Sequence, residues 1–75
     1  MMKRIEDFEL LVGDIAMTIE RIDNIDFIEV AIIEKPSLRA IYTCDTITLV
    51  SGNIPRDQIA YVTDKVKRNA RFLDK

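Results

Sequence analysis

The spacing of the apolar residues in this chain changes twice along the sequence. Over residues 5–22 they recur at intervals of three and four, which is typical of a helix. Over residues 27–50 they alternate as in strands, and over residues 59–73 the helical spacing returns. This pattern predicts a single α+β domain over residues 1–75, built as a helix, a three-stranded antiparallel sheet and a second helix.

The first predicted helix covers roughly residues 4–22. Its apolar stripe consists of Ile5, Phe8, Val12, Ile15, Ile19 and Ile22. A second interpretation stays open, because Ile15, Met17 and Ile19 also alternate with polar residues. It makes residues 14–21 a strand that forms a hairpin through Asp23-Asn24, giving a four-stranded, barrel-like sheet with a C-terminal helix. We favour the helix because its period holds over the whole of residues 5–22.

Three strands are predicted in the middle of the chain, at residues 26–34, 38–43 and 46–50. Isoleucine, valine, threonine and tyrosine are frequent there, as strands prefer, and Pro36 can begin a turn. The last helix is predicted to follow Gly52, with Asn53 as its N-cap and Pro55 in its first turn. Its inward stripe is formed by Ile59, Val62, Val66, Ala70 and Leu73.

Length and composition limit the core and suggest the protein's surroundings. A chain of 75 residues with 48% apolar content buries only about 60% of its extended-chain surface, so the core is marginal. We therefore expect leftover apolar surface to support self-association into a homo-oligomer. No apolar run is long enough for a membrane span, no signal peptide is visible, and a lone Cys44 fits a reducing compartment. The sequence thus predicts a soluble cytoplasmic protein.

Motifs for catalysis and for metal or cofactor binding are missing from the sequence. There is no histidine, the commonest general base near neutral pH, so Cys44 and Ser51 lack the usual activating partner. One cysteine without histidine cannot build a soft-ligand metal site. Gly13 and Gly52 stand alone and form no phosphate-binding loop. We expect a protein that is not an enzyme and that uses no metal and no cofactor.

A candidate self-association seam lies on the first predicted helix. Leu10 and Met17 are one heptad apart, with Gly13 between them. On a helix they would lie nearly opposite the main apolar stripe, where Gly13 would allow a second helix to approach closely. Isolated exposed apolar residues are also normal on protein surfaces, so both interpretations stay open.

The charges of the chain are unevenly distributed. Residues 1–34 carry nine acidic and three basic side chains, whereas residues 65–75 carry five basic and one acidic. Acids early in the first helix and bases late in the last helix also suit the two helix dipoles. A basic C-terminal segment is nevertheless a candidate for binding an anionic partner.

The candidate partner or nucleic-acid face lies on the last predicted helix. It comprises Tyr61, Lys65, Arg68, Arg71 and Phe72. Aromatic rings interleaved with cations suit nucleic acid, because rings stack on bases and cations meet phosphates. The alternative is that the two rings widen the core stripe while the bases keep the helix soluble. We expect a non-enzymatic protein–protein interaction module, a small regulatory or inhibitory protein; the alternative is a nucleic-acid-binding module.

Overall fold

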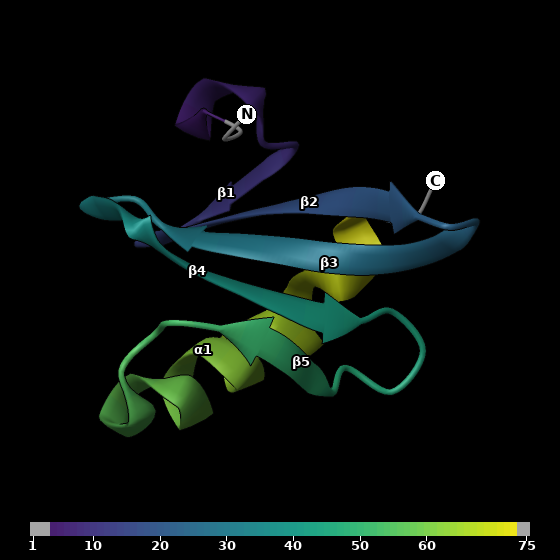
Figure 1. Cartoon of the computed structure of the whole chain (residues 1–75). Coiled ribbons are helices and arrows are strands. Elements are labelled where there is room, and N and C mark those ends of the chain that lie inside the picture. The colour runs from purple at the N-terminus through teal and green to yellow at the C-terminus, as the bar shows by residue number, and fades with distance from the viewer. Residues whose placement is uncertain (1–3, 74–75) are drawn as a thin grey trace.

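The computed structural model describes residues 4–73 and consists of one antiparallel sheet with one α-helix on one of its faces (Figure 1). The strands are β1 (Leu10–Val12), β2 (Ile15–Ile22), β3 (Ile25–Ile32), β4 (Lys35–Thr43) and β5 (Leu49–Gly52). They lie side by side in the order β1-β2-β3-β4-β5, so each strand pairs with its neighbours in sequence. A 3-10 turn η1 (Ile5–Asp7) precedes the sheet, and α1 (Arg56–Asn69) and a second 3-10 turn η2 (Ala70–Phe72) follow it.

The predicted fold is wrong in its first half. No helix covers residues 4–22; η1, β1 and β2 occupy this segment, and the sheet has five strands where three were expected. The alternative placed a strand at residues 14–21, which overlaps β2 but begins in the turn, and it missed β1 and so had only four strands. Among the described residues β1 and β5 do not pair with each other, so the sheet is open at both edges and forms no barrel.

Short turns explain why this segment is a hairpin. Val12 pairs with Ile15 across Gly13-Asp14, and Ile22 pairs with Ile25 across Asp23-Asn24. Gly13 has a φ of 60°, and Asp23 and Asn24 have φ values of 52° and 66°. Glycine, asparagine and aspartate tolerate this left-handed region best, and two successive residues in it form the turn that matches the twist of paired strands. Gly13 therefore begins a turn and does not interrupt a helix.

The main core lies between the sheet and α1, which is behind the sheet in the view of Figure 1. Alternate residues of β2, β3 and β4 point toward the helix and meet its buried residues. The fully buried members with the largest side chains are Tyr42, Ile15, Met17, Ile28, Val30, Val62 and Val66. The predicted inward stripe of the last helix is confirmed, since Val62, Val66 and Leu73 are buried and Ile59 and Ala70 pack against them.

The start of α1 differs in detail from the prediction. Pro55 occupies the N-cap position, and no side chain caps the helix. The predicted cap Asn53 instead joins the sheet: its Oδ1 accepts a hydrogen bond of 2.7 Å from the Arg39 amide, and its Nδ2 donates one of 3.0 Å to the Ser37 carbonyl. Asn53 thus fixes the chain that leaves β5 against β4.

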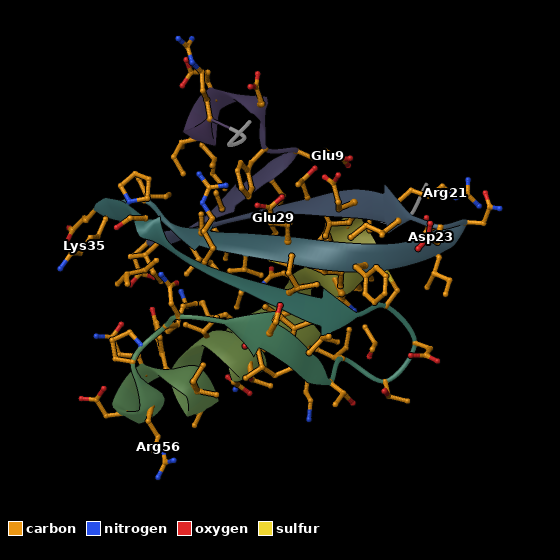
Figure 2. The ribbon with its side chains drawn as sticks, viewed as in Figure 1. Glu9, Arg21, Asp23, Glu29, Lys35 and Arg56 are labelled. Carbon is orange, nitrogen blue, oxygen red and sulfur yellow. The ribbon has the colours of Figure 1, made fainter. Side chains whose placement is uncertain are left out.

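The opposite face of the sheet is partly covered by the chain around η1. Phe8 packs on Ala16 and Ala31, whose small side chains leave room for its ring. The Arg39 guanidinium lies 5.2 Å from the centre of that ring, and its Nη1 donates a hydrogen bond of 3.0 Å to Glu29 Oε2. Figure 2 shows Glu29 on this face, which carries polar and acidic side chains beyond the Phe8 cluster. Only one side of the sheet therefore has an extended apolar core.

Candidate functional site on the C-terminal helix

The residues predicted as a binding face lie on one exposed side of α1 and η2. We call Tyr61, Lys65, Arg68, Arg71 and Phe72 the cationic flank. Lys65, Arg68 and Phe72 follow Tyr61 by four, seven and eleven residues and so return to the same side of a helix, and Arg71 extends this side round the outside. Tyr61 and Phe72 remain 48% and 54% exposed, so neither ring is absorbed by the core. The structure therefore brings these residues together, and the alternative in which both rings widen the core is not what it shows.

The N-terminal half of the flank is held against the β1–β2 turn. The Tyr61 hydroxyl donates a hydrogen bond of 2.9 Å to Asp14 Oδ1, and Lys65 Nζ lies 5.3 Å from the centre of the Tyr61 ring. A Cβ placed on Gly13 would come within 2.7 Å of that same Nζ, so the ammonium sits on the turn. Asp14 is a residue that sequence reasoning missed, because a contact across 47 positions leaves no local signal.

The C-terminal half of the flank has weaker internal contacts. Arg68 Nε pairs with Asp64 Oδ2 at 3.0 Å on the solvent-exposed surface, and the Arg71 guanidinium lies 5.0 Å from the centre of the Phe72 ring. Exposed pairs of this kind contribute about 0–1 kcal/mol each. Both guanidinium groups can therefore turn toward a partner at little cost.

The sheet and the helix carry opposite net charges. Residues 4–55 hold ten acidic and four basic side chains, and residues 56–73 hold five basic and two acidic. The flank holds three of these five bases. An anionic partner is therefore attracted to the helix side of the molecule and repelled by the sheet.

The structure lacks the helix over residues 4–22 on which the predicted self-association seam depended. It places the three residues of the seam in a hairpin. Leu10 and Met17 are partners across β1 and β2, and Met17 is fully buried in the core. Gly13 lies in the turn that joins the two strands. Met17 thus offers no surface to a second copy, and changing it to lysine would disturb the core.

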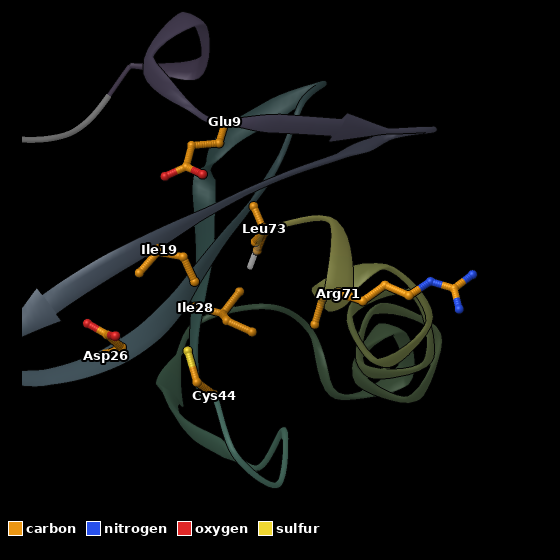
Figure 3. Close-up of a pocket in the computed structure, with 8 residues that line it drawn as sticks. Glu9, Ile19, Asp26, Ile28, Cys44, Arg71 and Leu73 are labelled. Atoms are coloured by element: carbon orange, nitrogen blue, oxygen red, sulfur yellow. The ribbon is translucent and has the colours of Figure 1, made fainter. Parts of the chain in front are cut away.

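A pocket of about 530 Å³ opens between the sheet and the end of α1 (Figure 3). Ile19, Ile28 and Leu73 form its apolar wall, and Glu9 and Asp26 add carboxylates. Arg71 contributes to the lining, but its guanidinium points away from the pocket in Figure 3. Cys44 is half-buried there and forms no disulfide. The lining thus combines apolar side chains with one thiol and two carboxylates.

Residues 4–73 contain neither a metal-ligand cluster nor a membrane-spanning helix. No group of three or more cysteine, aspartate and glutamate side chains is arranged to hold a metal ion within this range. No helix of this part of the chain is long and apolar enough to cross a membrane.

Comparison with protein families, with characterised proteins and with solved structures finds no match to this chain.

Proposed function

We propose that this protein is a non-enzymatic interaction module that binds an acidic surface of a partner protein through the cationic flank of α1. The observation that carries the proposal is the exposure of two aromatic rings on one helix side, each with a cation over it. Its role would be regulatory or inhibitory, exerted by covering the partner's surface. A single cysteine in the sequence suits a reducing compartment, so we place the module in the cytoplasm.

The residue types of the flank favour a protein partner. Tyrosine, phenylalanine and arginine are enriched at the centres of protein interfaces and often dominate their binding energy. Tyr61 and Lys65 are already fixed by Asp14 and the β1–β2 turn, so binding costs little side-chain entropy there. Arg68 and Arg71 can exchange their weak contacts for carboxylates of the partner.

Nucleic acid is the second candidate, favoured by the interleaving of rings and cations along the flank. Two observations count against it. The described residues outside α1 and η2 are strongly acidic, which repels a long polyanion. The Tyr61 ring already has the Lys65 ammonium close to its centre, which competes with a stacked base. Binding of RNA is therefore the less favoured result of the titration experiment.

The experiment compares two defined probes, an acidic peptide that contains aromatic residues and a single-stranded RNA oligomer. Amide chemical shifts locate binding, and titration at low and moderate salt measures affinity. We expect the peptide to shift amides of residues 61–72. Arg71→Glu should weaken its binding roughly tenfold, equivalent to the loss of one charge-assisted contact.

The matched control is Arg56→Glu, which makes the same charge change in the first turn of α1, at the opposite end of the helix from Arg71 and outside the flank. It should weaken binding much less than Arg71→Glu. Equal losses of affinity in the two variants would show that the peptide responds to the total charge of the protein and not to the flank. Tight binding of the RNA with a steep salt dependence would favour the second candidate, and shifts confined to the sheet would contradict both.

A further inference from the structure

The edge strand β5 differs from the other edge strand, β1, and from the three inner strands in that all of its residues are exposed. It pairs with β4 on one side, and no strand among residues 4–73 pairs with its other side. All four of its residues are exposed, although Leu49 and Val50 are apolar and retain 40% and 55% of their accessible surface. β5 therefore presents both unpaired backbone groups and apolar side chains to its surroundings.

β5 also lacks the charged side chains that prevent an edge strand from pairing with a strand of another molecule. Monomeric sheet proteins protect their edges with lysine or other charged residues, with very short strands, with β-bulges or with covering segments. The pairing of β5 with β4 is irregular between Ile41 and Tyr42, but β5 has none of the protecting charges. Residues 46–55 contain no charged side chain in a chain that is 32% charged. The opposite edge is better protected: β1 is three residues long, and Glu9 and Asp14 flank an uncharged run of only four residues.

An apolar groove of about 480 Å³ runs beside β5, between this strand and the first half of α1. Leu49, Gly52, Ile54, Ile59 and Ala60 line it, together with Arg56. The groove continues the apolar surface of the strand onto the helix side. A chain that pairs with the β5 backbone would also cover this surface.

We propose that β5 pairs antiparallel with β5 of a second copy of this chain, across a two-fold axis near Val50 and Ser51. Such an interface uses the same strand from both copies, and antiparallel backbone edges are complementary to themselves. The two sheets then continue as one. This surface is distinct from the cationic flank, so the inference goes beyond the proposed function.

Charge at the ends of the strand supports a second copy as the occupant. Asp45 precedes β5, and Arg56 follows it at the other end, where Figure 2 shows it on the first turn of α1. Antiparallel pairing places the Asp45 end of one copy beside the Arg56 end of the other, so opposite charges meet twice. Asp57 follows Arg56 and reduces this effect, so backbone pairing and the apolar side chains supply most of the affinity.

Sedimentation equilibrium of the full chain tests the proposal. The wild type should form a dimer in the micromolar range. Val50→Lys and Val50→Glu each place like charges close together across the axis, and each should raise the dissociation constant roughly tenfold or more. An equimolar mixture of the two variants should form a heterodimer at wild-type concentrations, because lysine then faces glutamate. Circular dichroism confirms that both variants are folded.

Leu11→Lys is the control, since Leu11 is an exposed apolar residue of the opposite edge strand β1. It should leave the dissociation constant unchanged. A wild type that stays monomeric up to millimolar concentration overturns the proposal. So does a mixture of Val50→Lys and Val50→Glu that fails to associate, or a loss of association with Leu11→Lys equal to that with Val50→Lys.

Discussion

A single buried hydroxyl joins the middle of the sheet to the helix. Tyr42 is fully buried on β4, and its hydroxyl shares a hydrogen bond of 2.8 Å with the Thr63 hydroxyl of α1. Tyrosine is placed in a core where its polar end finds a partner, because an unsatisfied hydroxyl there is costly. The pair therefore fixes the position of α1 along the sheet as well as filling the core.

The Tyr42–Thr63 pair gives a prediction about stability. Tyr42→Phe removes the hydroxyl with little change in shape and should lower the free energy of unfolding by about 1 kcal/mol. Urea denaturation measures the change. Thr63→Val should cost a similar amount, and the double variant should cost little more than either single one, because both remove the same bond. Fully additive losses would show that the two hydroxyls do not act together.

The two glycines should differ in how well they accept alanine. At Gly52 the φ is 148°, and a Cβ would come within 2.5 Å of the Arg39 carbonyl oxygen and 2.7 Å of the Ala40 Cα. These are backbone atoms of the neighbouring strand, so Gly52→Ala should lower the free energy of unfolding by about 2 kcal/mol or more. At Gly13 the close neighbour is the flexible Lys65 ammonium, so Gly13→Ala should cost only about 1 kcal/mol, mainly from its φ of 60°. Denaturation of both variants checks the order, and a larger loss at Gly13 would contradict it.

Turns of two residues recur every ten residues in the first half of the chain. They lie at residues 13–14, 23–24 and 33–34 and join β1, β2, β3 and β4. The first two use left-handed backbone, whereas the third has none and is followed by an irregularity in the pairing of β3 and β4. The register of the sheet is therefore set by turn chemistry at its start and by a bulge farther along.

The second turn gives a prediction for this hairpin. Asn24→Gly should leave the free energy of unfolding unchanged or raise it by about 0.5 kcal/mol, because glycine adopts a φ of 66° without strain. Asn24→Val should lower it by about 1–2 kcal/mol, since a β-branched residue resists this conformation. Thermal denaturation measures both. Glu34→Gly is the control: the third turn has no positive φ to relieve, so glycine there should only destabilise.

The sequence predicts the second half of the molecule better than the first, for a reason visible in particular residues. In the C-terminal segment most outward-facing residues are polar. The buried apolar residues Val62, Val66 and Leu73 therefore fit a helical spacing and no strand-like alternation. Around β1 and β2 both spacings fit, because the strands are apolar on both faces near Phe8 and Ala16. Gly13-Asp14 is also a weaker turn signal than asparagine followed by glycine. The deciding information is the turn conformation, for which the sequence signal is weak, and the packing of Phe8 on Ala16 and Ala31, which is not local in sequence.

In the candidate site, too, the features that depend on nearby residues could be predicted and those that depend on distant contacts could not. The spacing from Tyr61 to Phe72 predicted a common helix side, since that depends only on helical geometry. The link from Tyr61 to Asp14 and the open edge at β5 depend on which strands become neighbours. The predicted seam at Leu10 and Met17 depended on the helical spacing chosen for the first element, where the structure has β1 and β2.

The order of the strands has a consequence for how the molecule folds. Because every strand pairs with its neighbour in sequence, each pairing closes a loop of a few residues and loses little chain entropy. α1 is different: through Tyr61 and Asp14 it contacts a residue 47 positions earlier in the chain. The hairpins should therefore form at the main folding barrier, and the helix should dock after this barrier has been crossed. Stopped-flow kinetics should then find that Asn24→Val slows folding, whereas Val66→Ala mainly speeds unfolding, as expected for contacts made after the barrier is crossed.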